Sequence, residues 1–356
     1  GARRRKRRGR RPRGSTYLEP AERGGDSRVT LSSLSDARRL VPERLAEIQG
    51  RVVAARANRF TALATAFQNC GAYVDIPAGI ALEAPLQLLW SAQAGPARAV
   101  FPHTVVRVGS GARATIVERH VGDSEAFVCG IVEIELEPGA ELDYVTIQQA
   151  DEGARLFFHR AARCAAGSRI GWHVAELGAA LSQIAYDTQL IAPRASVATN
   201  AFYFAGNFAH FDVAIDVAHD AAETTSQTIV RAAVVDRGQG RFAGTIAIPR
   251  AATHCTASLR DDGLVLSRDA YLDARPSLEI AAGDVSCYQA SSVGSLDEER
   301  LFYVQSRGIA RSAAARMIAL AFFEPAIERF PGLTLREEVR TALDSRLDDL
   351  PDTFAS

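Results

Sequence analysis

Lysine, methionine and long apolar runs are nearly missing from this sequence. Of its 356 residues, one is lysine and one is methionine, so arginine supplies almost all of the positive charge. No apolar run approaches the roughly 20 residues that a membrane-spanning helix needs, and the longest one near the C-terminus covers residues 317–323. The arginine run at the start is followed by a polar stretch that supplies no signal-peptide core. These absences predict a cytoplasmic protein with no membrane partner.

Motifs of common enzyme classes are missing as well. There is no G-x-x-x-x-G-K-[ST] and no G-x-G-x-x-G, the loops whose backbone amides hold phosphates, and no G-x-S-x-G nucleophile motif. No C-x-x-C pair occurs among the five cysteines, which excludes a zinc ribbon, and a disulfide scaffold is not expected at this length. We expect reduced thiols, most of them buried, at Cys70, Cys129, Cys164, Cys255 and Cys287.

The charge is divided unevenly along the chain. The formal net charge is −1, from 41 basic and 42 acidic residues, but residues 1–14 hold nine basic residues and no acidic one. The remainder therefore carries a charge of −10, which we assign largely to acidic residues on solvated strand faces. Residues 1–33 are predicted to be a disordered basic tail. We interpret the tail as a start-site extension or a processed arm and expect no nucleic-acid partner, although a steep salt dependence that vanishes without residues 1–14 would indicate one.

The periodicity of apolar residues changes twice along the chain. Residues 34–70 show helical spacing, and residues 71–295 alternate with period two. Within the second region, turn-then-strand units recur at intervals of 28, 28, 27, 28 and 28 residues, beginning at Gly111, Gly139, Gly167, Arg194, Ala222 and Arg250. A fixed period of this size indicates stacked β coils that share one core, rather than an antiparallel sandwich or a doubly wound sheet. The sequence therefore predicts a β-helix over residues 71–295.

Residues 296–356 return to helical spacing. Asp297 is a predicted N-cap, Pro325 is a predicted kink, and one helical face is formed at i, i+4 spacing by Leu335, Val339, Leu343 and Leu347. We expect the N-terminal and C-terminal helical regions to cap the two ends of the solenoid, since open coil edges pair readily with other molecules.

Two clusters of residues deserve consideration as chemical sites. His210, Asp212 and Asp216 share one face of a predicted strand, with His219 close by, which is compatible with a metal or acid–base site. A solvated strand face with one His–Asp hydrogen bond is the favoured interpretation. The second cluster, His254 with Cys255 and Cys287, contains ligands for a soft metal, but buried inert cysteine is favoured there.

A string of short motifs near the C-terminus carries a family resemblance. It comprises Leu278-Glu-Ile280, Gly283-Asp284-Val285, Cys287, Val293-Gly294, Leu296-Asp-Glu-Glu299, Leu301-Phe-Tyr303 and Ser306-Arg-Gly-Ile309. On these motifs, residues 62–329 resemble the SufB/SufD family of iron–sulfur cluster assembly scaffold subunits, and SufD more closely than SufB. The resemblance implies a mainly β protein, a right-handed parallel β-helix (solenoid) flanked by N-terminal and C-terminal helical regions. It also implies a subunit that is not an enzyme.

The resemblance further implies partners and a cargo. Subunits of this kind pair with a SufB-like paralogue through their β-helices and bind a SufC-like ABC-type ATPase through their C-terminal helices. Residues at the start of the C-terminal region then become partner-binding candidates: Leu296, Phe302, Tyr303 and Arg307. No stably bound cofactor is implied, only a transient Fe–S cluster at the SufB-like interface. A flavin has been associated with such complexes, but no residue here localises one.

One departure from the family pattern concerns the cluster ligands. The segment that usually reads C-x-H-G-A-T in SufD is Cys287-Tyr-Gln289-Ala-Ser-Ser here, so Gln289 occupies the histidine position. An amide is a poorer ligand for iron than imidazole. Three alternatives stay open: the partner holds the cluster, Cys287 is a ligand, or His254 substitutes for the missing imidazole. We favour the first.

A different class of function is the alternative. A stand-alone β-helix that binds carbohydrate or acts on polysaccharides has the same fold, but such proteins usually carry a secretion signal. Cleavage of pectin-type polymers would identify it.

Overall fold

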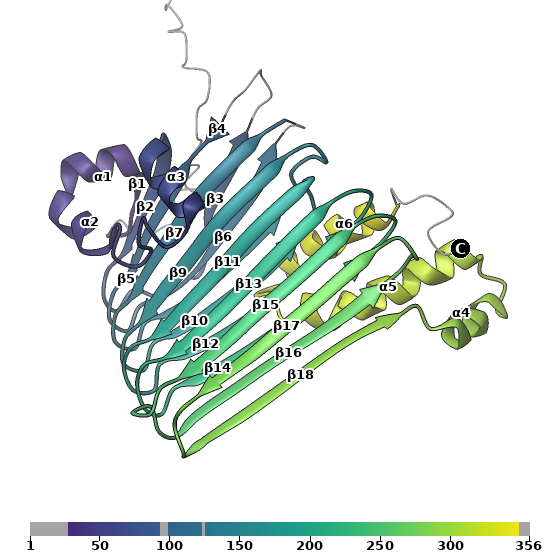
Figure 1. Ribbon diagram of the computed structural model, residues 1–356. Helices are drawn as coiled ribbons and strands as arrows, with labels where there is room; N and C mark the ends of the chain where they lie inside the picture. Colours follow the sequence, from purple (N-terminus) through teal and green to yellow (C-terminus); the bar gives the residue numbers. More distant parts are fainter. Residues whose placement is uncertain (1–27, 93–98, 123–124, 349–356) are drawn as a thin grey trace, which may run out of the picture.

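The computed structural model describes residues 28–92, 99–122 and 125–348 (Figure 1). Its centre is a solenoid of two facing β-sheets. The ten-stranded sheet contains β1 (Thr30–Ser33), β2 (Cys70–Ile76), β4 (Ala99–Val100), β5 (Pro102–Val108), β7 (Phe127–Leu136), β9 (Arg155–Cys164), β11 (Leu181–Leu190), β13 (His210–His219), β15 (Gln239–Ile248) and β17 (Tyr271–Ile280). The eight-stranded sheet contains β3 (Leu86–Ala92), β6 (Arg113–Gly122), β8 (Glu141–Gln148), β10 (Arg169–Glu176), β12 (Ser196–Ala205), β14 (Thr225–Val234), β16 (Cys255–Val265) and β18 (Val285–Ser295).

From β5 onward, successive strands alternate between the two sheets, and all strand pairs except β1–β2 are parallel. Each coil therefore contributes one strand to each sheet, which confirms the predicted mainly β solenoid with helical regions on both sides. Corresponding positions follow at 28, 28, 27 and 29 residues from Arg113 to Thr225, close to the predicted period. The last two offsets, Thr225 to Thr256 and Thr256 to Ser286, lengthen to 31 and 30.

One corner of each coil turns through a residue with positive φ. In the earlier coils the corner residue is glycine, and in the later coils it is Arg194 (φ 61°), Glu223 (φ 59°) or His254 (φ 58°). Positive φ is favourable for glycine and costs other residues free energy. The corner residues stack because their N–H groups donate to the next coil, as Gly139 does to Ala166 and His254 to Asp284. The turn signal found in the sequence is this corner at Gly111, Gly139, Gly167 and Arg194, whereas the units predicted at Ala222 and Arg250 begin one and four residues before the corner.

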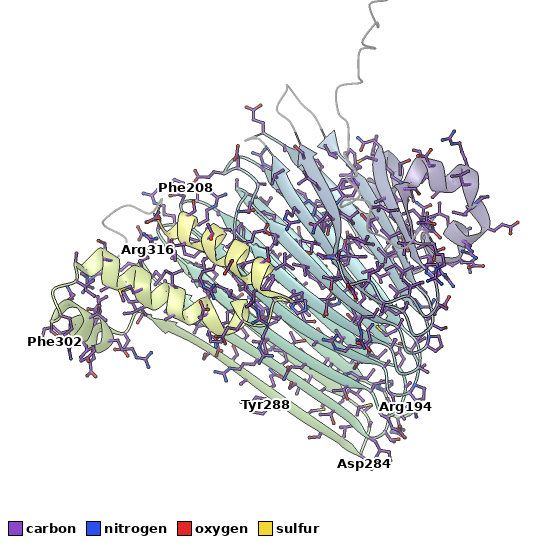
Figure 2. The ribbon with its side chains drawn as sticks, turned by 180° about the vertical axis from the view of Figure 1, so that it is seen from behind. Arg194, Phe208, Asp284, Tyr288, Phe302 and Arg316 are labelled. Atoms are coloured by element: carbon purple, nitrogen blue, oxygen red, sulfur yellow. The ribbon has the colours of Figure 1, made fainter. Side chains whose placement is uncertain are left out.

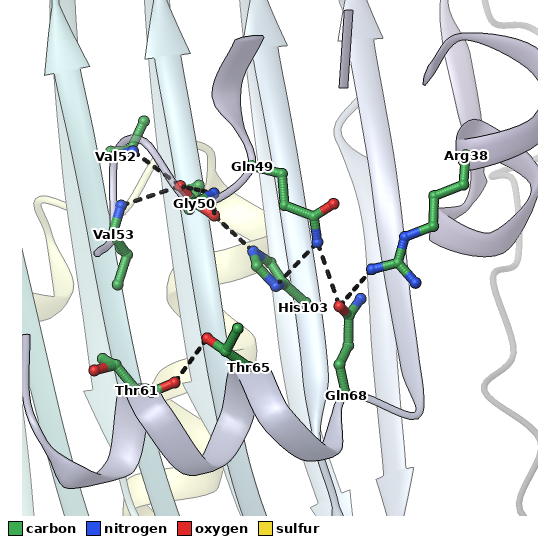
Figure 3. A network of polar contacts seen from close by, with 10 residues as sticks. Arg38, Gln49, Gly50, Val52, Val53, Thr61, Thr65, Gln68 and His103 are labelled. Carbon is green, nitrogen blue, oxygen red and sulfur yellow. Dashed lines mark hydrogen bonds and ion pairs between the residues drawn. The ribbon is translucent and has the colours of Figure 1, made fainter. Parts of the chain in front are cut away.

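The N-terminal helices lie on the outer face of the ten-stranded sheet. α1 (Leu34–Leu40), α2 (Pro42–Ile48) and α3 (Arg59–Phe67) contact β2, β5, β7 and β9. The turn between α2 and α3 is fastened by the buried carboxylate of Glu133, which accepts the N–H groups of Gly50, Val52 and Val53 at 2.7–3.0 Å (Figure 3). Glu133 is therefore not on a solvated strand face as its alternating pattern predicted, because this turn covers it.

The C-terminal helices cover the outer face of the eight-stranded sheet. α4 (Glu298–Gln305) is capped by the Asp297 side chain as predicted, and α5 (Arg311–Ile327) continues past Pro325. α6 (Leu333–Asp348) buries its predicted i, i+4 face, formed by Leu335, Val339, Leu343 and Leu347. Asn200 on β12 donates to the carbonyl of Ala326 at 2.8 Å, and Arg119 on β6 pairs with Glu338 at 2.7 Å. Both contacts hold the helices against this sheet.

Two expectations about the ends of the solenoid are wrong. Residues 30–33, assigned to the disordered tail, form β1 and pair antiparallel with β2, whereas residues 1–27 lie outside the described part of the chain. The C-terminal helices do not cap the last coil, because their apolar faces pack on residues of the sheet's outer face such as Ile147 and Phe204. In the described residues, nothing covers the edges of β17 and β18 (Figure 1). None of the described helices combines the length and apolar character needed to cross a membrane.

Candidate functional site

The uncovered end of the solenoid, formed by β17 and β18, is the candidate site. Each strand has one strand neighbour within the described chain: β17 pairs with β15, and β18 pairs with β16. Their inward-facing side chains are left half open, with Ile280 39% and Val293 48% exposed. Leu272 and Leu278 are also only partly buried against the core. The hydrophobic core is therefore unsealed at this end, and two rows of backbone N–H and C=O groups are unpaired by strands.

Cys287 lies inside this last coil. It is aligned with Ala257 of β16, and its side chain packs against the core. Burial, with a smaller effect from Cys255, raises the pKa of the Cys287 thiol. A metal ligand must be the thiolate, so this environment works against metal binding by Cys287 in the uncovered subunit.

Gln289 also faces into the last coil. It is aligned with Leu259 of β16, and its Nε2 donates to the carbonyl of Pro276 on β17 at 2.9 Å. The amide therefore ties the two facing sheets together at the position where SufD-like sequences carry histidine.

His254 lies elsewhere. It occupies the positive-φ corner before β16, is 63% exposed, and its Nδ1 lies 2.9 Å from Oδ2 of Asp284. Asp284 and the corner residue Arg194 are on the same edge of the solenoid (Figure 2). The structure places His254 at the outside of a corner and Cys287 on the inside of a strand, so it does not bring these two candidate ligands together.

The partner-binding candidates divide into exposed and half-buried residues. Phe302 and Tyr303 on α4 are 72% and 61% exposed, and Phe302 projects from the end of the helical region (Figure 2). Arg307 donates to the Tyr303 hydroxyl at 3.0 Å and stacks on its ring. Leu296 instead packs against the apolar cluster beneath the C-terminal helices. The exposed aromatic pair is the part of this set that is available for contact.

The His/Asp cluster on β13 shares one strand face, as its spacing predicts, but its members bind to neighbouring strands. His210 Nδ1 lies 3.2 Å from the Gln239 side chain, and Asp216 accepts the N–H of Thr245. His219 is buried between hydroxyls at 2.7 and 2.8 Å, and burial lowers its pKa to about 4. These contacts are structural, as the favoured interpretation expected, but the partners of the cluster among the described residues are Gln239, Thr245, Thr224 and Ser226 and not a His–Asp pair. No group of three or more His, Cys, Asp or Glu side chains is arranged for a metal within the described residues.

A buried charged cluster inside the solenoid was missed from the sequence. Arg160 on β9 donates to Glu118 on β6 at 3.0 Å and lies 3.1 Å from Nε2 of His120. Burial would raise the pKa of Glu118, but Arg160 and His120 bring it down to about 2. Glu176 on β10 is bonded by Ser182 at 2.9 Å, and burial raises its pKa to about 7. The signal for this cluster is the 28-residue offset, which aligns His120, Gln148 and Glu176 in one inward row.

Comparison with known proteins agrees with this architecture. Residues 90–322 match the family model described as SUF system FeS cluster assembly, SufBD core domain. An iron-sulfur cluster assembly SufBD family protein of Staphylococcus saprophyticus is 25% identical over 309 residues, covering 86% of this chain and 66% of the relative. Proteins of the same description from Staphylococcus haemolyticus and Staphylococcus aureus are each 26% identical, over 322 and 283 residues, covering 88% and 79% of this chain and 67% and 61% of the relatives.

The chain thus spans about two thirds of the length of these relatives. The matched segment begins in β3 and ends within α5, so it contains almost the whole solenoid, the uncovered end and α4. This match, extending over more than half of the residues, shows that the chain belongs to the SufBD core-domain family of the SUF system for FeS cluster assembly.

Proposed function

We propose that this chain is a non-catalytic scaffold subunit that pairs with a SufB-like paralogue across its uncovered end. The observation that supports this is the unsealed core at β17 and β18, where apolar side chains such as Val293 remain half exposed. A second β-solenoid docked edge to edge would bury these side chains and pair the open strands, which is the usual way for an exposed sheet edge to be satisfied. The nascent cluster would be cargo at this junction.

The partner, rather than this chain, is proposed to hold the cluster. Cys287 is partly buried with a raised thiol pKa, Gln289 is engaged with Pro276, and His254 is turned away at a corner. Cys287→Ala should therefore leave both complex formation and cluster formation intact. A complete complex that assembles but forms no cluster with this variant would assign a ligand role to Cys287.

The exposed aromatic pair on α4 is proposed to bind a SufC-like ATPase. Phe302 and Tyr303 present apolar area on a helix whose opposite side, at Leu301, is fully buried. Aromatic side chains of this kind commonly anchor protein interfaces. ATP-driven movement of the ATPase would then reach the solenoid through α5, which packs on β12 and β14.

Co-expression with the SufB-like and SufC-like proteins of the same genome tests the proposal. A stable complex is expected by size-exclusion chromatography with light scattering. Val293→Asp places a charge on the uncovered apolar end and should abolish pairing while the isolated subunit stays folded, because Val293 is already 48% exposed. A chain that binds neither protein would contradict the scaffold function. An assembly role also agrees with the cytoplasmic location that we predict, and the family membership leaves no support for the polysaccharide-active alternative.

A further inference from the structure

The uncovered end contains a buried carboxylate without a counter-charge. Asp261 on β16 faces inward, aligned with the core residue Val230, and is only 2% exposed. Its one hydrogen-bond donor among the described residues is the Ser291 hydroxyl on β18, at 3.3 Å from Oδ2. No Arg, Lys or His in the described part of the chain forms an ion pair with it.

The next residue shows what a satisfied carboxylate looks like in this strand. Asp262 faces outward and lies 2.8 Å from the Arg260 guanidinium and 3.8 Å from that of Arg231, and it accepts the Ser292 hydroxyl at 3.0 Å. The outward-facing Asp262 therefore has two arginine partners, whereas the inward-facing Asp261 has none among the described residues. Buried carboxylates are normally paired.

A second polar group near Asp261 also lacks a partner. The hydroxyl of Tyr203 on β12 is buried and forms no hydrogen bond with the described residues. Burial, and after it the charge of Asp261, raises the pKa of this hydroxyl. The inside of the last coils thus contains a carboxylate without a cation and a hydroxyl without an acceptor or donor. Asp261 lies one strand from β18, the last strand of the eight-stranded sheet.

We infer that Asp261 is a recognition site for an inward-facing cationic side chain of the partner solenoid, and that it favours such a partner over a second copy of this chain. This inference rests on the proposed pairing across β17 and β18. A partner strand beside β18 would be two strand spacings from β16, about 10 Å. Lysine and arginine have the long side chains needed to reach Asp261 from that distance.

Self-pairing is disfavoured by the same charge. Burial raises the pKa of Asp261 to about 7, so above that pH two copies docked end to end would enclose two unpaired carboxylates in one lumen, where water no longer screens them. The sole lysine of this chain is Lys6, in the N-terminal run, and the inward residues of β18 near Asp261 are Gln289, Ser291 and Val293. Within the described residues, neither β17 nor β18 of a second copy would present an inward basic side chain at this position, since the one arginine of these strands, Arg275, is aligned with the outward residue Ala243.

Binding measurements with matched variants test the inference. The probe is the SufB-like protein of the same genome, and the variants are Asp261→Asn and Asp262→Asn, which differ only in whether the inward or the outward carboxylate is removed. Asp261→Asn should weaken partner binding about thirtyfold or more, the cost of removing one member of a buried charge pair. Asp262→Asn should change it less than threefold. Both substitutions keep an acceptor for the serine on β18, and circular dichroism checks their folding.

A third variant tests the inference without a substitution at the buried Asp261. Gln289→Arg adds a cation on the exposed last strand and should weaken binding of a cationic partner at least tenfold, while wild-type folding is retained. Equal binding by wild type, Asp261→Asn and Gln289→Arg would overturn the inference and leave the proposed function standing.

Self-association provides an arm that does not depend on the partner. In sedimentation equilibrium at pH 8, Asp261→Asn should dimerise at least tenfold more tightly than wild type, and Asp262→Asn should not. If wild type binds no SufB-like protein, the proposed function and the recognition of a cationic partner fail together, and this arm then decides only whether Asp261 opposes self-pairing. Unchanged self-association of Asp261→Asn would then overturn it.

Discussion

Nε2 of His103 lies 2.7 Å from Oε1 of Glu133, inside the seam between the N-terminal helices and the solenoid. Both side chains are almost fully buried, and the same carboxylate accepts three backbone N–H groups of the turn after α2 (Figure 3). One side chain of the solenoid thus holds an imidazole of a neighbouring strand and the backbone of a separate helical segment. This relationship leads to the first prediction.

Glu133→Gln should loosen the N-terminal helices from the sheet. The amide would turn an N–H group toward backbone donors, leaving buried groups unsatisfied, so we expect a loss of about 3 kcal/mol in the free energy of unfolding. Urea denaturation measures the loss, and hydrogen exchange should show faster exchange at Gly50, Val52 and Val53. Glu135→Gln on the same strand as Glu133 is the control, since among the described residues the Glu135 carboxylate pairs only with Arg163 of the neighbouring strand β9, at 3.4 Å. Equal effects of the two variants would contradict the role of Glu133.

Stability should fall as pH rises from about 4.5 to about 7 because of Glu176. Burial raises the pKa of this carboxyl from 4.5 to about 7, so the folded state holds a proton that the unfolded state releases. The stabilisation is fully present below pH 4.5 and is lost as pH rises to about 7, by at most about 3 kcal/mol.

Urea denaturation of wild type and Glu176→Gln at several pH values isolates this contribution. The amide keeps an acceptor for Ser182 but cannot ionise, so the variant should gain stability relative to wild type as pH rises from 5 to 8. A difference between the two proteins that is independent of pH would show that Glu176 titrates normally in the folded state.

Neighbouring residues of α4 should separate partner binding from folding. Phe302→Ala removes a side chain that is 72% exposed, so it should weaken binding of the SufC-like ATPase with little change in unfolding free energy. Leu301→Ala removes a fully buried side chain and should cost about 2–5 kcal/mol of stability. Calorimetric titration and thermal melts measure the two effects. Binding that survives Phe302→Ala would locate the ATPase surface elsewhere.

His254→Gly should be tolerated. Glycine adopts the positive φ of this corner without strain, which offsets its greater freedom in the unfolded chain, so stability should stay within about 1 kcal/mol of wild type. Cluster formation in the complete complex should also persist, because the imidazole is directed to Asp284 at the outside of the corner. Loss of cluster formation without loss of stability would make His254 a ligand after all.

The coil architecture was predictable because each coil repeats one physical problem. Coils can stack only if the corner residue, the inward apolar row and the strand length recur in each coil. The 28-residue interval from Gly111 to Gly139 and Gly167 reflects this recurrence. The helical face of α6 was predictable for a similar reason. Its apolar residues at i, i+4 spacing require an apolar neighbour, whichever element supplies it.

The position of the helices and the inward charges were not predictable from alternation alone. Period two separates the faces of a strand but does not say which face is inside, and in the run Glu118-Arg119-His120 both faces are polar. A weaker signal existed for the helices: consecutive apolar residues such as Ala201 to Phe204 indicate a strand covered on both faces. The uncovered end was not predicted, because the sequence of one chain contains no pattern that marks a strand edge without a neighbour.

The corner residues change from glycine to larger residues along the solenoid, so its two ends differ in backbone strain. Corners at Gly111, Gly139 and Gly167 carry no backbone strain, whereas those at Arg194, Glu223 and His254 each store about 1–2 kcal/mol. The last coil has a neighbouring coil on one side within the described residues, so we expect thermal opening to begin at β17 and β18 and to proceed toward the N-terminal coils. A partner that binds this end would therefore stabilise the whole solenoid, and its removal would let the coils open one after another from β18.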